Sequence, residues 1–283
     1  MEIIDAFNSA LDYIEDNLDG EIDLRRASGL AACSQFHFQR MFAYVTGVSL
    51  TEYIRRRRMT KAALELIDGG EKVIDLALKY GYESPTAFNR AFKSVHGVAP
   101  SAAKSRGIGL TAFPRLTFTI SVKGEEAMNY RIEKKEGFRV VGFHTTVPAD
   151  MEESFAQVPK FWDECEGKMD ELSALPAGRG PGGILGICAD GEDKCEYYIA
   201  AASDAPVPQG MKALDIPEST WAIFECVGAM PDSIQNMQKR ILTEWLPGSG
   251  YELGCAPDIE VYAPGDQSSP DYRCQTWLPI RKK

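Results

Sequence analysis

The sequence lacks any run of 18 or more apolar residues, the length that a membrane-spanning helix needs. Its first residues, Met1 to Asp5, form neither the basic cluster nor the apolar stretch of a secretory signal. The chain has 283 residues, enough for about two domains, and 44% of them are hydrophobic, as in ordinary globular proteins. We therefore expect a cytoplasmic protein of two domains.

Patterns that bind metal are also missing. The seven cysteines form no C-x-x-C pair, and their odd number argues against a disulfide framework and against a zinc ribbon. His37, one of three histidines, has no His, Cys or acidic partner at ligand spacing. We expect no metal and no cofactor, and we interpret most of the cysteines as small buried hydrophobic residues. A thiol that senses oxidation is the alternative, because that role requires an exposed thiol of low pKa.

Acidic residues dominate only one half of the chain. The net charge of −10 lies entirely in residues 109 to 283, which hold 17 Lys and Arg against 27 Asp and Glu. Residues 24 to 108 carry 14 basic and 6 acidic side chains, a net charge of +8. An excess of basic side chains is typical of a surface that binds nucleic acid. The first half is therefore expected to have a basic face.

The sequence contains a repeat at an offset of fifty residues. In each copy a short apolar segment, residues 24 to 31 or 73 to 80, is followed by a turn and a second amphipathic segment. A serine precedes that second segment and a glycine follows it, which indicates a helix with an N-cap and a left-handed C-terminal residue. This spacing is typical of two helix-turn-helix units. The identical pairs include Ala27 and Ala77, Ser34 and Ser84, Phe38 and Phe88, Arg40 and Arg90, Phe42 and Phe92, Gly47 and Gly97, and Val48 and Val98.

Each second helix has an apolar stripe with i, i+3, i+4 and i+7 spacing, and the opposite face is expected to point outward. Arg can bond the edge of guanine, Gln and Asn that of adenine, and an aromatic or methyl surface can meet a thymine methyl. Solvated surface charge is the alternative for the arginines, and His37 is interpreted as a packing or phosphate-facing residue. The predicted DNA-contacting residues are Phe36, Gln39 and Arg40 in the first copy and Thr86, Asn89, Arg90 and Lys93 in the second.

One long helix is predicted to join the two copies. Ser49 to Glu52 form a capping box, and the helix that they open runs to Asp68. About 18 residues at 1.5 Å each give a rod of about 27 Å, which can place two recognition helices in successive major grooves. The run Arg55 to Arg58 goes around this helix, so one or two of its members should contact phosphate and the others should pair with acids.

Residues 5 to 106 resemble the DNA-binding domain of the AraC/XylS family of transcription regulators. The resemblance implies an all-α domain of two helix-turn-helix units, joined by the long helix, that binds double-stranded DNA. The residues that carry it are Gly47 to Ser49, Tyr53 to Arg55, Ile74 to Ala77, Gly81 and Tyr82, Ala91 to Lys93, and Gly97 to Ser101.

The second half predicts a duplicated α+β domain. A pattern of strand, helix, strand and strand occurs over residues 139 to 202 and again over residues 221 to 279. Two such units can join their strands into one antiparallel sheet with both helices on one side and a groove between the halves. Residues 116 to 122 alternate apolar and polar, which suggests an edge strand between the domains. The predicted segments are a DNA-binding domain at 1 to 108, a linker with the edge strand at 109 to 127, and the second domain at 128 to 283.

Three segments of the second half carry a further resemblance: Glu244 to Glu252, Pro257 to Tyr262, and Trp277 to Ile280. Through them, residues 128 to 281 resemble the gyrase-inhibitor-like (GyrI-like) effector-binding domain that also occurs in multidrug-responsive regulators of the MerR class. The order of the two domains is that of the Rob-like regulators. In this family a glutamate on the sheet meets cationic lipophilic ligands, and the matching residue is Glu260. The resemblance implies a groove for a small lipophilic or cationic effector.

Strand alternation separates Glu260 and Tyr262 from Ile259 and Val261. If Ile259 and Val261 pack under the helices, Glu260 and Tyr262 line the groove, where a carboxylate beside aromatic rings suits a cation. The alternatives are an ordinary exposed acid for Glu260 and a filling role in the core for the aromatic residues. The candidate walls of the groove are Trp162, Tyr198, Trp221 and Trp277.

These features predict a sequence-specific DNA-binding transcription regulator whose second domain binds a small effector. One rival is a hydrolase of small electrophilic compounds with Glu260 as general base. Another is a protein-interaction module that contacts a polymerase or gyrase subunit, and for a regulator RNA polymerase is the expected protein partner. The sequence has no coiled coil or other dimer motif, so two DNA-reading helices in one chain allow a monomer to bind DNA.

Overall fold

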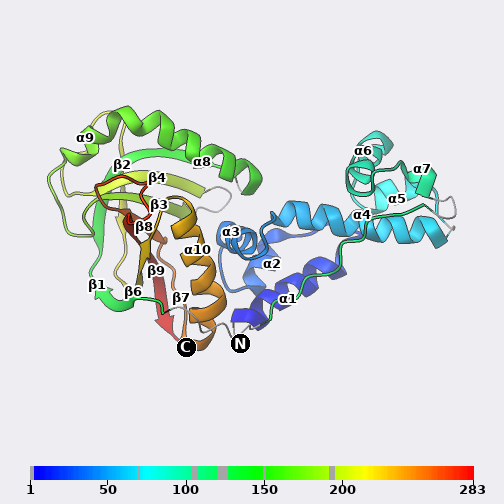
Figure 1. Ribbon diagram of the computed structural model, residues 1–283, viewed down its shortest axis with the longest axis horizontal. Helices are drawn as coiled ribbons and strands as arrows, with labels where there is room; N and C mark the ends of the chain where they lie inside the picture. Colours follow the sequence, from blue (N-terminus) through cyan, green and yellow to red (C-terminus); the bar gives the residue numbers. More distant parts are fainter. Residues whose placement is uncertain (1–2, 69–70, 104–107, 120–126, 149–150, 191–194) are drawn as a thin grey trace. The chain divides into compact units, whose positions relative to one another are not determined.

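The computed structural model describes residues 3–68, 71–103, 108–119, 127–148, 151–190 and 195–283 (Figure 1). The chain divides into two compact units, Met1–Gln35 with Val48–Thr119 and Phe36–Gly47 with Ile120–Lys283. The second unit therefore includes one helix of the predicted DNA-binding domain. Among the described residues, no helix is both long and apolar enough to cross a membrane.

The first unit is built from helices whose ends follow the sequence. Asp23 caps the second helix by accepting from the backbone N–H groups of Arg25 and Arg26. Ser84 caps the helix Pro85–His96 by accepting from the N–H of Ala87 at 3.2 Å. Gly97 ends that helix at φ 75°, which glycine adopts without steric cost. The helices are α1 (Ile3–Asp16), α2 (Leu24–Leu30), α4 (Leu50–Asp68), α5 (Val73–Lys79), α6 (Pro85–His96) and α7 (Pro100–Ala103).

The second helix-turn-helix copy has a core of its own. Phe88 and Phe92 of α6 are fully buried, with ring centroids 5.9 Å apart. They pack with Leu76 and Tyr80 from the α5 region and with Met59 of α4. Burying one such ring stabilises the fold by about 1.5–3 kcal/mol. The predicted apolar stripe of this copy is therefore its packing face.

The four arginines of the run Arg55–Arg58 all make contacts within the first unit. The first two pair with Glu52. The third pairs with the buried Glu15 at 2.8 Å. The fourth donates to the backbone carbonyls of residues 18 and 20, at 3.0 and 2.7 Å. Pairing with acids is thus confirmed for three of them, and contact with phosphate stays a prediction.

Residues 108–119 do not form the predicted strand. Helix side chains bond their backbone instead: Asn8 donates to the carbonyl of Phe118 at 2.9 Å and accepts from its N–H at 2.8 Å. Thr60 accepts from the N–H of Phe113 at 3.0 Å. Because side chains satisfy these backbone groups, no strand pairing is required. The edge strand is therefore wrong for residues 116–119, and residues 120–122 lie outside the described part of the chain.

The second unit has an antiparallel sheet, and the described residues contribute nine strands to it (Figure 1). Their order is β1-β6-β9-β8-β3-β4-β2-β5, with β7 paired to β9. The two predicted passes meet where β3 pairs with β8. The short strand before each pass pairs with the other pass, because β1 pairs with β6 and β5 pairs with β2. The strands are β1 (Tyr130–Lys135), β2 (Phe138–Val147), β3 (Ile184–Asp190), β4 (Cys195–Ala202), β5 (Lys212–Ile216), β6 (Ser219–Val227), β7 (Tyr251–Leu253), β8 (Ile259–Tyr262) and β9 (Arg273–Lys282).

Two long helical segments of this unit confirm the predicted passes. The first packs against β2 and the second against β6 and β9. A 3-10 turn, Glu166–Lys168, extends the first segment, and a π-helical turn, Ile241–Trp245, extends the second. The helices are α3 (Gln35–Thr46), α8 (Met151–Cys165), α9 (Met169–Ser173), α10 (Asp232–Arg240) and α11 (Leu246–Gly248).

The two faces of the sheet are the reverse of the expectation for β8. Glu260 and Tyr262 lie on the face that α8 and α10 cover, because Gln238 and Trp162 from those helices contact them. Ile259 and Val261 do not pack under the helices. One buried cluster on the other face contains Ile259, Val261, Tyr198, Trp221 and Trp277. The last three therefore do not line a groove around Glu260, which corrects their assignment as its walls.

Most of the cysteines are buried, as predicted. Cys255 is exposed and Cys33 is half-buried. The buried thiols are Cys165, Cys188, Cys195, Cys226 and Cys274. Burial raises the pKa of Cys165, which keeps that thiol protonated and unreactive.

Candidate functional sites

Glu260 lies on β8, near the middle of the helix-covered face. Gln238 donates from Nε2 to Glu260 Oε1 at 2.9 Å, and Tyr262 donates from its hydroxyl to Oε2 at 2.7 Å. Burial raises the pKa of Glu260 above its ordinary value, although the bond from Tyr262 and the charge of Arg40 oppose the shift. A carboxyl group in this setting is ionised more readily when a cation lies close to it.

Gly186 allows close packing in front of Glu260. It lies directly opposite Glu260 in the register of β3 and β8. A Cβ atom at this position would lie 2.8 Å from the hydroxyl oxygen of Tyr197 and 3.3 Å from Glu260 Oε2. A close-packed interior does not accommodate the shorter of these contacts without displacing the tyrosine. The close approach of Tyr197 and Glu260 therefore depends on glycine here.

Aromatic side chains line the space beside Glu260. Trp162 and Tyr262 have ring centroids 4.9 Å apart, and Trp162 donates from Nε1 to the hydroxyl of Tyr197 at 2.9 Å. Burial raises the pKa of Tyr197 and of Tyr262, so both hydroxyls stay protonated. The sequence predicts Trp162 and Tyr262 at this site and misses Tyr197. We call Trp162, Tyr197, Gln238, Asp258, Glu260 and Tyr262 together the Glu260 surface.

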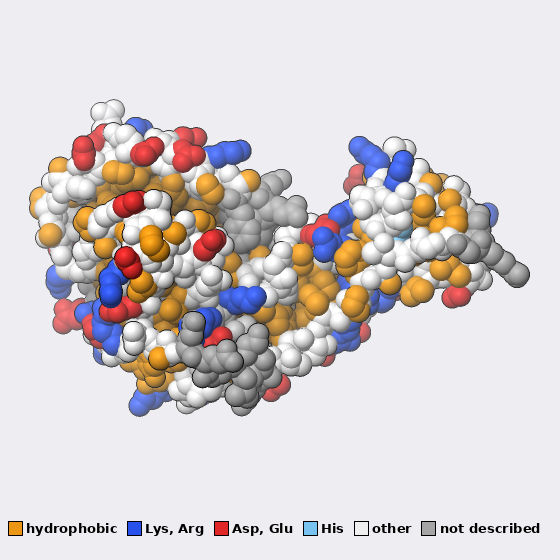
Figure 2. Space-filling view, in the orientation of Figure 1, with side chains coloured by type: hydrophobic (Ala, Val, Ile, Leu, Met, Phe, Trp, Pro, Cys, Tyr) orange, Lys and Arg blue, Asp and Glu red, His pale blue; other side chains and the backbone are white. Residues whose placement is uncertain are grey.

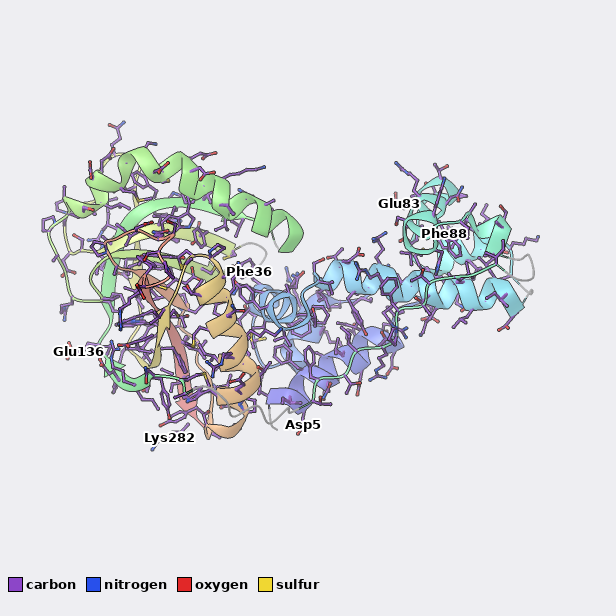
Figure 3. All side chains as sticks on the ribbon, in the orientation of Figure 1. Asp5, Phe36, Glu83, Phe88, Glu136 and Lys282 are labelled. Carbon is purple, nitrogen blue, oxygen red and sulfur yellow. The ribbon has the colours of Figure 1, made fainter. Side chains whose placement is uncertain are left out.

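Helix α3 packs on the Glu260 surface. Arg40 donates from Nη2 to Asp258 Oδ2, and only 10% and 9% of these two side chains is exposed. Phe36, which Figure 3 labels, lies one turn earlier on α3. It is part of the apolar cluster that includes Phe143 and Tyr197. The guanidinium carbon of Arg40 lies 5.9 Å from the centre of the Phe36 ring. Thus α3 brings an aromatic ring and a cation to the same place.

The charges at this contact favour the pairing. Burial alone would lower the pKa of Arg40, but the acidic groups around it, Asp258 first and Glu260 among the others, together outweigh burial and hold that pKa above its ordinary value. Burial and the charge of Arg40 lower the pKa of His37 to about 4. His37 is therefore neutral near pH 7. A single positive charge of α3 then lies near two carboxyl groups, those of Asp258 and Glu260.

Little space remains between α3 and the sheet. The pocket that His37, Arg40 and Tyr44 line together with Gln238 and Thr276 has a volume of about 20 Å³. This volume has room for about one water molecule. Binding sites for small molecules commonly have about 300–1,000 Å³.

A second, larger hollow lies elsewhere in the same unit. It has a volume of about 900 Å³, and its lining includes Trp162, Glu166, Gly180, Tyr262 and Asp266. This hollow has room for a drug-sized molecule. It shares Trp162 and Tyr262 with the Glu260 surface, whereas Glu260 itself is not among its lining residues.

The predicted DNA-contacting residues have opposite environments in the two copies. In α3, Phe36, Gln39 and Arg40 are 7%, 2% and 8% exposed, so their expected outward exposure is wrong. Phe36 and Arg40 are covered because they meet the second unit's own sheet domain. Figure 2 shows Lys and Arg side chains gathered over α6. In α6, the four predicted residues are all exposed: Thr86, Asn89, Arg90 and Lys93. DNA contact by all seven residues stays a prediction.

Two polar atoms of α3 are buried at a cost. Within the described part of the chain, Gln39 Nε2 and Arg40 Nε have no hydrogen-bond partner. Leaving a buried donor unpaired costs about 1–3 kcal/mol. Amide and guanidinium donors are the groups that bond base edges in a DNA groove.

A chain that carries two helix-turn-helix copies and a separate surface with a carboxylate beside aromatic rings has the parts of a ligand-responsive transcription regulator. The model of the GyrI-like small molecule binding domain family matches residues 128–281. A helix-turn-helix domain model matches residues 28–106. The chain belongs to the GyrI-like family, and it is a DNA-binding transcription regulator with an AraC-type N-terminal region and a C-terminal effector-binding domain. This confirms both predicted resemblances.

The chain is similar to known proteins over part of its length. The multiple antibiotic resistance protein MarA of Salmonella typhimurium is 43% identical over 95 residues, which are 34% of this chain and 75% of MarA. The HTH-type transcriptional activator AarP of Providencia stuartii is 41% identical over 89 residues, 31% of this chain and 66% of AarP. The solved structure of SAV2435 bound to tetraphenylphosphonium is 24% identical with a TM-score of 0.49, and the match covers 54% of this chain and 94% of SAV2435.

Proposed function

We propose that the Glu260 surface binds small lipophilic cations and that the bound cation controls DNA binding by the two helix-turn-helix units. The observation that carries this proposal is the pair of acids, Asp258 and Glu260, beside Trp162, Tyr197 and Tyr262. Aromatic rings attract a cation through their quadrupole. Burial penalises the charge of Glu260 unless a cation lies near it, so a cationic ligand gains from both effects.

For the DNA-binding half, we propose that one chain reads two major grooves. The 19 residues of α4 give a rod of about 28 Å, close to the repeat of the major groove. Two recognition helices in one chain allow a monomer to bind DNA. We keep the segments 1–108, 109–127 and 128–283 as functional domains. The proposed DNA contacts are Phe36, Gln39, Arg40, Thr86, Asn89, Arg90 and Lys93.

We further propose that the protein activates transcription in the cytoplasm and contacts RNA polymerase there. Support comes from AarP, whose name describes a transcriptional activator. Transcription in the presence and absence of a lipophilic cation, with purified polymerase, tests this role. Repression under both conditions would contradict it.

We also propose that the Glu260 surface binds its ligand without hydrolysing it. Both carboxyl oxygens of Glu260 accept hydrogen bonds from the neutral donors Gln238 and Tyr262, an arrangement that holds a counter-charge in place. The raised pKa of Glu260 is the observation that favours the hydrolase alternative, because a general base works best with a pKa near the working pH. Hydrolysis of 4-nitrophenyl acetate should be the same for the native protein and Glu260→Gln. A rate that Glu260→Gln abolishes would support the hydrolase.

The main test compares a cation with a neutral molecule of similar shape. Calorimetry should show that Glu260→Gln weakens tetraphenylphosphonium binding about ten- to a hundredfold, because a charge-assisted contact contributes about 1.5–3 kcal/mol. Triphenylphosphine oxide should bind both proteins with similar affinity. The substitution keeps the shape and the hydrogen-bonding capacity of the side chain and removes its charge.

Glu252→Gln is the matched control, because Glu252 lies on β7, pairs with Arg281 and is not part of the Glu260 surface. It should leave both affinities unchanged. An equal loss for the cation and for the neutral molecule would assign Glu260 a packing role. No loss for either would contradict the proposed site.

A further inference from the structure

Helix α3 carries the same chemistry that the Glu260 surface is proposed to select. Phe36 and Arg40 are four residues apart, so they project from the same side of the helix. The ring enters the apolar cluster with Phe143 and Tyr197, and the guanidinium bonds Asp258. Together they place an aromatic group and a permanent cation on the surface. In effect, α3 presents a lipophilic cation from within the chain.

An external ligand and α3 cannot both occupy the part of this surface that Asp258 and Glu260 form. The pocket that α3 lines together with Gln238 and Thr276 has only about 20 Å³, far below the roughly 300 Å³ of the smallest usual ligand sites. Binding a drug-sized cation beside Glu260 therefore requires α3 to leave. The exchange also explains why the ligand should be charged. Removing Arg40 alone would leave Asp258 buried without its partner, and a cation that arrives replaces the lost charge.

The residues that α3 buries here are those proposed to read DNA. Phe36, Gln39 and Arg40 cannot enter a major groove while they are 7%, 2% and 8% exposed. The unpaired Gln39 Nε2 and Arg40 Nε indicate that these donors are better satisfied in another state of the helix. In α6 the equivalent face is exposed. The contact therefore covers one DNA-reading helix and leaves the other accessible.

We propose that α3 is an internal competitor of the effector. While α3 is docked on the Glu260 surface, this first recognition helix cannot bind DNA. A lipophilic cation displaces α3, so that both recognition helices can bind. This inference rests on the proposed function of the Glu260 surface. Because the two ligands favour the same released state, linkage requires the cation to strengthen DNA binding and DNA to strengthen cation binding by the same factor.

The first experiment removes the internal cation and measures ligand affinity. Arg40→Ala should tighten the binding of tetraphenylphosphonium to the full chain about tenfold or more. In the native protein the cation binds only those molecules in which α3 is released, so the apparent affinity is reduced by the fraction of molecules in that state. Arg90→Ala is the matched control at the equivalent position of α6, and it should bind the cation as the native protein does. Equal affinity of Arg40→Ala and Arg90→Ala would overturn the inference.

The second experiment needs no ligand. Asp258→Asn removes the charge that holds Arg40 and should raise the affinity for DNA about tenfold by releasing α3. The DNA is a duplex selected from a random pool with the full-length variant. Asp271→Asn, an exposed site with the same change of net charge, controls for the general gain from removing an acid. If both variants bind DNA with the same affinity, α3 does not restrain DNA binding.

The outcomes separate this inference from the proposed function. Loss of cation binding in Glu260→Gln, with no gain in Arg40→Ala, would retain the ligand site and overturn the competition. If neither the native protein nor Arg40→Ala binds the cation, the proposed function fails, and the DNA affinity of Asp258→Asn still decides whether α3 is restrained. Circular dichroism establishes that each variant is folded. For a variant that is not, hydrogen exchange of α3 in the native protein, with and without the cation, gives the answer.

Discussion

Helices α3 and α6 derive from one repeated sequence unit, yet their outward faces meet different surroundings. The face of α6 is exposed, whereas that of α3 is buried on the Glu260 surface. The shared serine, phenylalanines and glycine set the ends and the inner stripe of each helix. They do not decide what the outer face contacts.

The residues that differ between the copies account for the two outcomes. Both helices carry the arginine, but Phe36 in α3 corresponds to Thr86 in α6. A phenylalanine ring that enters an apolar cluster gains about 1.5–3 kcal/mol from burial, and a threonine offers little of this gain. In α3 the aromatic residue and the arginine each have a partner on the Glu260 surface, and the outer face of this copy is therefore a packing face.

The largest expected effect is on the free energy of unfolding, and it distinguishes a residue of the inner stripe from one of the outer face. Phe88→Ala should lower the free energy of unfolding of the first unit by about 3–5 kcal/mol, because Phe88 is fully buried in the core with Phe92. Phe36→Ala should change this free energy of unfolding by less than about 1 kcal/mol, since Phe36 is part of the second unit and packs there with Phe143 and Tyr197. Denaturant unfolding measures both. An equal loss would mean that Phe36 belongs to the core of the DNA-binding half, and the comparison would fail.

DNA affinity should separate the two arginines. Arg90→Ala should weaken binding by about 1–3 kcal/mol with or without tetraphenylphosphonium, because Arg90 is exposed in both conditions. Arg40→Ala should weaken it by a similar amount only when the cation is present and α3 is free. Fluorescence anisotropy of a labelled duplex measures these affinities. A loss for Arg40→Ala that is the same without the cation would show that α3 reads DNA while docked.

The smallest expected effect is a pH dependence that only α3 has. His37 has a pKa lowered to about 4 by burial and by Arg40, against about 6.5 for a free histidine. Docking is therefore favoured fully above pH 6.5, and it loses about 1 kcal/mol as the pH falls from 7.5 to 5.5. The protection of the α3 amides, which is the exchange rate relative to the intrinsic rate at each pH, should fall as the pH falls over this range. The protection of the α6 amides should not, because Ala87 holds the equivalent position.

His37→Ala is the control for this effect. It matches Ala87 and removes the histidine without changing Glu260, whose own titration is then common to both proteins. The difference between the native protein and His37→Ala isolates the contribution of His37. An identical pH profile for the two would contradict the assignment of the lowered pKa to the docked state.

The local parts of the fold follow from the sequence because they depend on neighbours in the chain. The cap of Ser84, the left-handed Gly97 and the inner stripe of α6 are all predicted. Strand alternation also finds both passes of the sheet. The exchange of β1 and β5 between the halves escapes prediction, because it pairs segments far apart in the chain, such as Tyr130 with Phe224. A short edge strand carries too little pattern to reveal such a partner.

The site was accessible to prediction only where one residue carried the signal. The resemblance indicates Glu260, and alternation adds Tyr262. Alternation also separates Tyr197 from Tyr198, but only the packing of α8 shows that Tyr197 is on the covered face. Gly186 in the middle of an apolar strand is a signal that could have been used, since such a glycine often marks a close approach. The pair of Arg40 and Asp258 joins positions 218 residues apart, and no local pattern reports it.

Hydrogen exchange of α3 and α6 with and without tetraphenylphosphonium tests the account most directly. Both helices are observed in one sample, so each is the reference for the other. A lipophilic cation that displaces α3 should accelerate exchange of its amides about tenfold and leave those of α6 unchanged. If α3 exchanges at the same rate or more slowly when the cation is bound, the ligand does not compete with the helix, and the central claim is contradicted.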